Sequence, residues 1–156
     1  MTNVVRFLQF FALGTWVGGI IFLSFVEAPG VFGVLGPHRD QAGNIVGYSL
    51  TRLHYIGVVA ALIYLVAGFA IVKSAKWLIT PAAILVMAML ALTAISQFAV
   101  RPRMAVLRAE MVSIDATPPE NTLRARFDRL HRLSVQLEGA TLLAGVVAIF
   151  LTVRGT

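Results

Sequence analysis

Four long apolar stretches, separated by short segments rich in charged residues, dominate the pattern of this chain. Each is about as long as the roughly 20 residues that an α-helix needs to cross the hydrocarbon core of a bilayer. A helix also satisfies its own backbone hydrogen bonds, which lipid cannot do. We therefore predict four membrane-spanning helices, at about residues 5–27, 49–73, 77–100 and 129–153.

Prolines and charged residues predict how these spans end and connect. The first span is expected to stop at Ala28-Pro29-Gly30, with residues 31–35 lying in the membrane interface. Residues 73–76 form a tight hairpin between the second and third spans, and residues 103–112 a short amphipathic helix. A charged extension at 120–132 leads into the last span. The predicted fold is all-α, a single integral membrane four-helix bundle over residues 1–156.

Composition supports a chain whose surface is covered by lipid. Hydrophobic residues make up 58% of the chain and charged residues 13%, whereas soluble domains carry charge at about a quarter of their positions. The net charge of +6 comes from bases that flank apolar runs. The lipid bilayer with its anionic headgroups is therefore the expected partner, and nucleic acid is not. The absence of cysteine excludes disulfides, thiolate metal sites and thiol catalysis.

The distribution of basic residues predicts an orientation. Nine of the 13 lysines and arginines lie in residues 27–52 or 101–132, which share one face of the membrane. The positive-inside rule then places loops 28–48 and 101–130 in the cytoplasm and both termini outside, in a bacterial-type plasma membrane. The first apolar run is long enough to span and lacks a small-residue cleavage site, so we do not expect a cleaved signal peptide.

Two segments indicate an internal repeat. Thr51-Arg52-Leu53-His54 resembles Asp128-Arg129-Leu130-His131, and an Ala-Gly pair follows at the same distance in both. We predict a tandem duplication of a two-helix hairpin, whose pseudo-twofold axis runs along the membrane normal. The repeat would place His54 and His131 at matching depth on opposite sides of the bundle. It would also make Glu27 and Arg101 corresponding residues.

Polar side chains at helical spacing predict stripes that face a common vestibule on the loop side. Ionisable residues within lipid are costly and normally face the bundle interior, and Glu138 is the clearest case. The stripes are His131, Ser134, Glu138 and Thr141 on the last helix, Thr93, Gln97 and Arg101 on the third, and Thr51 with His54 on the second.

The candidate ligand- or ion-binding residues are His54, His131, Glu138, Glu27, Arg101 and Gln97. Glu138 either locks the bundle through Arg101 or Gln97, or acts as a proton-relay or ion-binding carboxylate. Glu27 and Arg101 are expected to form a closing ion pair. The two histidines are either hydrated helix ends or the two axial ligands of a haem b. A third interpretation is a metal site formed by Glu27 with both histidines.

Three motifs resemble the TMEM205-like (DUF4149) membrane proteins: Leu13-Gly-Thr-Trp-Val-Gly-Gly19 with Glu27-Ala-Pro29, Arg101-Pro-Arg-Met104, and Phe127-Asp-Arg-Leu-His-Arg-Leu-Ser134. The resemblance implies a four-span protein, carries over His54 and His131 as motif positions, and implies no established activity. The first helix is more distantly similar to that of CopD-like and HemJ-like membrane proteins. Those families place a histidine there, where this chain has Gln9 as its nearest polar residue.

The sequence leaves three hypotheses of function open. The first is binding or transport of a small ligand or ion at a polar intramembrane site. The second is a haem-binding redox protein that uses His54 and His131. The third is a non-catalytic accessory subunit, either in a larger membrane complex or as a homo-oligomer. The chain contains no phosphate loop, nucleophile elbow or metalloprotease helix, which favours a role other than catalysis.

Overall fold

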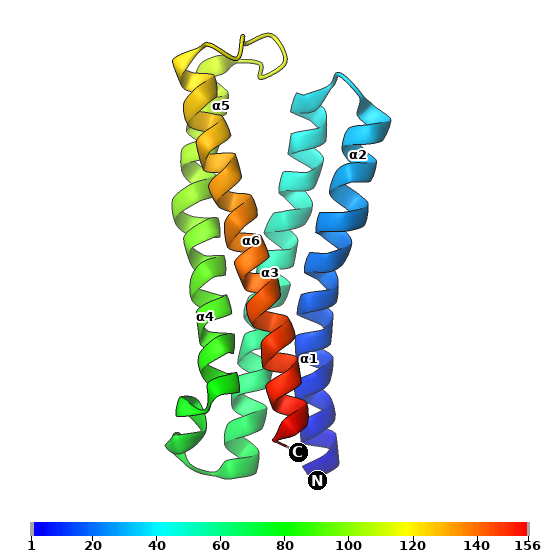
Figure 1. Ribbon diagram of the computed structural model, residues 1–156, viewed down its shortest axis with the longest axis vertical. Helices are drawn as coiled ribbons and strands as arrows, with labels where there is room; N and C mark the ends of the chain where they lie inside the picture. Colours follow the sequence, from blue (N-terminus) through cyan, green and yellow to red (C-terminus); the bar gives the residue numbers. More distant parts are fainter. Residues whose placement is uncertain (1, 156) are drawn as a thin grey trace.

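The computed structural model describes residues 2–155 and consists of long, nearly parallel helical rods (Figure 1). Four of its helical segments are long and apolar enough to cross a membrane. The all-α membrane bundle is thereby confirmed. The elements are α1 (Thr2–Phe22), η1 (Leu23–Glu27), α2 (Ala28–Leu35), α3 (Arg39–Val72), η2 (Ala75–Ile79), α4 (Pro81–Ile95), η3 (Ser96–Val100), α5 (Arg101–Met111) and α6 (Thr122–Arg154).

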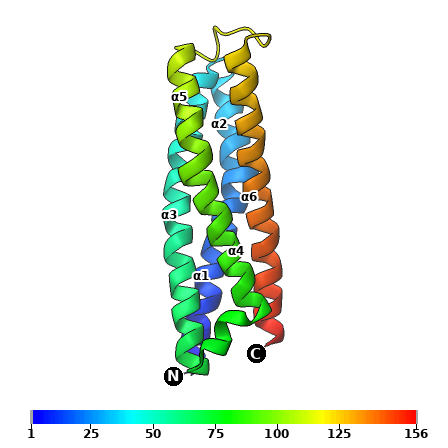
Figure 2. The ribbon, with the colours of Figure 1, turned by 90° about the vertical axis from the view of Figure 1, so that its left-hand side faces the viewer.

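The two ends of the bundle differ in what they carry. Both termini and η2 lie at one end, which we call the terminal end (Figures 1 and 2). The connection from α2 to α3 and the loop at residues 112–121 lie at the other, which we call the loop end. Because α3 and α6 run in the same direction, their central residues lie at similar heights along the bundle.

The predicted end of the first span at Pro29 is wrong, because the helix continues to Leu35. A π-helical turn, η1, precedes Pro29, and the equivalent turn η3 precedes Pro102. In each, the residue before the proline donates its N–H five positions back, Ala28 to Leu23 and Arg101 to Ser96. A proline lacks the N–H that a helix needs and crowds the preceding turn, and a widened turn accommodates it without ending the helix.

A π-helical turn precedes a proline in both halves of the chain, which supports the predicted duplication. The pairing of the helices supports it as well. The most extensive contacts join α1 to α3 and α4 to α6. Each half of the chain is therefore a two-helix unit. The second and fourth spans also begin earlier than expected, at Arg39 and Thr122, which extends the helices well beyond the bilayer at the loop end.

Large side chains of one helix pack against small residues of the next in the core. Gly57 of α3 lies against the Trp16 ring of α1, and Gly68 lies against Trp77. Polar groups near the terminal end are also paired. The Tyr64 hydroxyl hydrogen-bonds the Thr152 hydroxyl at 2.8 Å, and both side chains are buried. The close approach of glycines to the rings of neighbouring helices is typical of helix packing in lipid, where no hydrophobic effect drives helices together.

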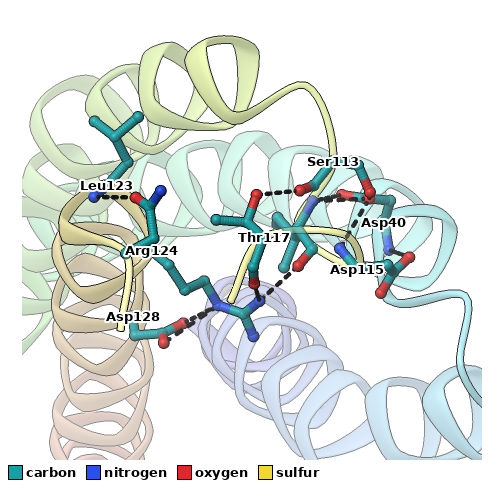
Figure 3. A network of polar contacts seen from close by, with 9 residues as sticks. Asp40, Ser113, Asp115, Thr117, Leu123, Arg124 and Asp128 are labelled. Atoms are coloured by element: carbon teal, nitrogen blue, oxygen red, sulfur yellow. Dashed lines mark hydrogen bonds and ion pairs between the residues drawn. The ribbon is translucent and has the colours of Figure 1, made fainter. Parts of the chain in front are cut away.

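At the loop end, the 112–121 loop is fastened to the start of α3 (Figure 3). The Asp40 carboxylate accepts hydrogen bonds from the Ser113 hydroxyl at 2.8 Å and from the Ile114 N–H at 2.9 Å. In return, the Asp115 carboxylate accepts from the N–H groups of Arg39 and Asp40 at 3.1 and 3.2 Å. Asp115 thus caps the first turn of α3 with a negative charge.

The other side of this loop is held by α6. The Arg124 guanidinium donates to the Ile114 carbonyl at 2.6 Å and pairs with Asp128 at 3.2 Å (Figure 3). The loop therefore links the N-terminal half of the molecule to α6. At this end α2 packs on α3, and α5 packs on α6. The loop therefore joins these two pairs of helices.

Candidate functional site

A buried polar cluster joins three helical segments near the middle of α3 and α6. The His54 Nε2 atom of α3 lies 2.6 Å from Glu138 Oε1 of α6. The other ring nitrogen, Nδ1, lies 2.8 Å from Gln97 Oε1 of η3. His54 is 2% exposed and Glu138 is 8% exposed. Every polar atom of the imidazole is thus used within the protein.

Arg101 extends this cluster toward the loop end. Its guanidinium donates to the Thr51 hydroxyl and, at 3.4 Å, to Gln97 Oε1. The Thr51 hydroxyl donates in turn to the Gly47 carbonyl at 2.9 Å. A continuous chain of polar contacts therefore runs from Glu138 through His54, Gln97 and Arg101 to Thr51. It begins at the centre of the bundle and ends at half-buried side chains nearer the loop end.

The π turn places the two middle members of this chain. Gln97 lies within η3, and Arg101 supplies the N–H that closes the turn on Ser96. Turns of this kind are rare inside helices and occur frequently at functional sites. Here the turn lets one rod present Gln97 to His54 and Arg101 to Thr51. The same residues also allow Pro102 to follow without ending the helix.

Hydrogen-bonding chemistry assigns the protons of the cluster. A guanidinium only donates, so the Gln97 atom that faces Arg101 is its carbonyl oxygen. That oxygen also faces His54 Nδ1, which must therefore carry a hydrogen. His54 Nε2 and Glu138 Oε1 are then left to share one proton across 2.6 Å. The pair is either imidazolium with carboxylate or neutral imidazole with carboxylic acid.

The space beside the cluster is small. A cavity of about 30 Å³ is lined by His54, Tyr55, Val58, Thr93, Ala94, Gln97 and Phe98. This is about the room of a single water molecule, whereas sites for small organic ligands are roughly ten times larger or more. The buried Thr93 hydroxyl lines this wall and has no hydrogen-bond partner among residues 2–155. The space beside the cluster is therefore too small for an organic ligand.

The structure brings four of the six candidate residues together and leaves two apart. His131 is exposed, and its ring stacks parallel to that of Phe127 at 6.4 Å. The Glu27 side chain is half-buried and makes no hydrogen bond or ion pair with any described residue. The expected ion pair between Glu27 and Arg101 is not formed, because Arg101 turns toward Thr51 and Gln97.

The alternatives that need both histidines do not fit this arrangement. A haem with two axial histidines requires two free ring nitrogens that face one iron. Both nitrogens of His54 are in hydrogen bonds, and His131 lies on the exposed surface. Residues 2–155 likewise contain no group of three or more histidine or acidic side chains that could hold a metal ion.

The sequence predicted neither the partner of Glu138 nor the hydrogen bonds that hold the 112–121 loop against α3 and α6. It paired Glu138 with Arg101 or Gln97, whereas the direct contact is with His54. Helical spacing indicates which residues share a face, but not which face of another helix they meet. Asp115 follows the predicted helix at 103–112, and Asp40 lies where no helix was predicted, so the sequence singled out neither residue.

The fold and the cluster define a multi-pass membrane protein with an ionisable pair buried between its helices. Residues 11–113 match the model of the family described as a domain of unknown function, DUF4149, and the chain belongs to that family. The matched region contains His54, Gln97 and Arg101, and Glu138 lies beyond it. No curated protein and no solved structure matches the chain.

Proposed function

We propose that this protein binds a proton at the His54–Glu138 pair and uses it in proton- or ion-linked transport across the membrane. The observation that carries the proposal is the 2.6 Å contact between His54 Nε2 and Glu138 Oε1 in a buried position. A proton-binding carboxylate beside a histidine is a common element of intramembrane relays. The space beside the pair leaves no room for an organic ligand, which supports a proton as what the pair binds.

The chain of contacts toward the loop end supports a direction for proton exchange. Gln97, Arg101 and Thr51 connect the buried pair to half-buried groups, while the other end of α3 is closed by apolar packing and the Tyr64–Thr152 pair. In the orientation that the basic residues favour, with the loops in the cytoplasm, the pair exchanges its proton with the cytoplasmic side.

The decisive variant is Glu138→Gln, which keeps the size and a hydrogen bond to His54 but cannot ionise. Purified protein is reconstituted into vesicles that contain a pH-sensitive dye, and proton entry is followed under an imposed membrane potential. The wild type is expected to acidify the vesicles, and Glu138→Gln to give the rate of protein-free vesicles. Glu110→Gln, at an exposed position, should keep the wild-type rate.

Unchanged proton entry in Glu138→Gln would refute the role of this carboxylate. A wild-type rate equal to that of protein-free vesicles would refute proton transport as a whole. Circular dichroism and size-exclusion profiles of each variant establish that the fold is retained.

One surface favours the accessory role as a second candidate function. Gly14 and Gly18 lie on the exposed side of α1, and a Cβ at either position would meet no atom within 4 Å. Two glycines at this spacing allow close contact between membrane helices. The exposed rings of Phe7 and Phe11 continue this face. We propose it as a contact for a second copy or for a larger membrane complex.

Substituting leucine at both Gly14 and Gly18 should prevent such close approach. We expect the double variant to be monomeric under conditions in which the wild type is oligomeric, as measured by subunit counting in lipid bilayers. Gly139→Leu is the control, since it lies on the exposed side of α6 and also has open space around it. A wild type that is monomeric throughout, or a double variant that still associates, would remove this candidate as a homo-oligomer contact.

A further inference from the structure

A groove of about 510 Å³ lies between α5 and α6 at the loop end, far larger than the cavity beside His54. Its lining is almost entirely apolar, and three arginines at its rim contribute their aliphatic stems to it. Its residues are Pro102, Arg103, Val106, Leu107, Arg126, Arg129 and Leu130. None of them belongs to the polar cluster of the proposed transport site, so a ligand in this groove does not depend on that proposal.

The three arginines of the rim are free of counter-ions. Arg103, Arg126 and Arg129 are exposed and make no ion pair or hydrogen bond with any described residue. Asp128 pairs with Arg124, and the carboxylates of Asp40 and Asp115 bind backbone N–H groups (Figure 3). The exposed acids Glu110 and Glu120 form no ion pair with these arginines. The groove therefore carries three positive charges that the protein itself does not neutralise.

The depth of the groove corresponds to the headgroup layer of a bilayer. The apolar rod at 81–100 is about 30 Å long at 1.5 Å per residue, which is one hydrocarbon thickness. Arg101 follows that rod, and the groove begins with Pro102 and Arg103. On α6, the groove residues Arg126 to Leu130 precede the apolar stretch that starts at Leu133. Arg103, Arg129 and Leu130 thus lie nearest to the hydrocarbon, and Val106, Leu107 and Arg126 lie about one helical turn farther out, so the groove as a whole lies outside the hydrocarbon.

We propose that this groove binds an anionic phospholipid. The phosphate would sit among Arg103, Arg126 and Arg129, whose planar guanidinium groups match phosphate oxygens in two-point hydrogen bonds. The glycerol backbone of the lipid would contact Leu130 near the hydrocarbon, while Val106 and Leu107 line the outer part of the groove beside the headgroup. Basic pockets between helices at the cytoplasmic surface favour anionic over zwitterionic lipids. The groove lies next to the hydrocarbon edge of the bilayer, where lipid phosphates are concentrated, which favours the lipid over free phosphate as the source of the phosphate.

The test is titration of the detergent-purified protein with phosphatidylglycerol and with phosphatidylcholine, followed by native mass spectrometry. The wild type is expected to bind one phosphatidylglycerol more tightly than phosphatidylcholine. Replacing Arg103, Arg126 and Arg129 by glutamine should weaken phosphatidylglycerol roughly tenfold or more, given the contribution of each basic residue at an anionic surface. The charge-matched control replaces Arg39, Arg52 and Arg132, which are exposed at the same end but do not line the groove.

A second variant tests the apolar lining without changing charge. Val106 is 57% exposed, so Val106→Trp can fill the groove without disturbing the core, and it should also weaken phosphatidylglycerol. The proposal is overturned if the groove variants bind phosphatidylglycerol like the wild type, or if the control triple loses as much affinity as the groove triple. It is also overturned if inorganic phosphate displaces the lipid completely at equal concentration, because the site would then be specific for a free anion.

Discussion

Replacing His54 by leucine is expected to lower the free energy of unfolding by about 3–5 kcal/mol, because Glu138 would lose its partner in a buried position. Glu138 lies on α6, so its carboxylate cannot turn to water without disturbing the helix pairing. Unfolding in mixed micelles, followed by circular dichroism, measures the loss.

The double variant His54→Leu/Glu138→Leu should recover most of this stability. Replacing both members of a buried pair by apolar residues is often neutral or stabilising, whereas removing one is not. The partly buried pair Arg124–Asp128, one helical turn apart at the loop end, is the comparison, and its coupling should be about 0.5 kcal/mol or less. A stable double variant without proton transport would show that the pair serves function. A double variant as unstable as the single one would contradict direct coupling between His54 and Glu138.

Gly57→Ala is expected to destabilise the protein by about 1–3 kcal/mol, because the core at this position is already full. An added Cβ would lie closer than 3.0 Å to three atoms of the Trp16 ring. Trp16 is 1% exposed and has no room to withdraw. The thermal unfolding midpoint in detergent should therefore fall.

The same substitution at Gly139 should have the opposite sign. A Cβ there meets no atom within 4 Å, so the change only replaces a poor helix former by a good one, and stability should rise by up to about 1 kcal/mol. Trp16→Phe added to Gly57→Ala should restore part of the loss by making room. A stabilising effect of Gly57→Ala would mean that α1 and α3 do not pack through Trp16 and Gly57.

Much of the fold could be predicted because lipid imposes simple rules on sequence. Charges such as Arg6, Lys73 and Arg154 flank runs of helical length, and this alone located the four spans. The helix ends were less predictable. Proline normally ends a helix, and only the π turns before Pro29 and Pro102 explain why these rods continue. No local sequence pattern predicts such a π-helical turn.

The polar site could be predicted as a set of residues but not as a set of contacts. His54, Gln97, Arg101 and Glu138 were selected because polar groups in a span must find partners. Which partner each one finds depends on how the helices are rotated about their axes, and spacing does not fix this. His131 lies on the same stripe of α6 as Glu138. At the level of His131, however, α6 packs on α5, and the side of α6 that carries His131 is exposed. The tandem duplication stays a prediction, and its two matching histidines, His54 and His131, have different surroundings.

The contact between His54 and Glu138 also has an electrostatic consequence for how an acid can reside in a membrane at all. Whether the shared proton is on nitrogen or on oxygen, the pair carries no net charge. The lipid surroundings therefore meet a dipole rather than a monopole, and the largest part of the solvation penalty of an ion does not arise. Transfer of the proton between the two atoms, which lie 2.6 Å apart, converts an ion pair into a pair of neutral groups with a much smaller dipole. Only the departure of the proton from the pair would expose the hydrocarbon region to a full negative charge.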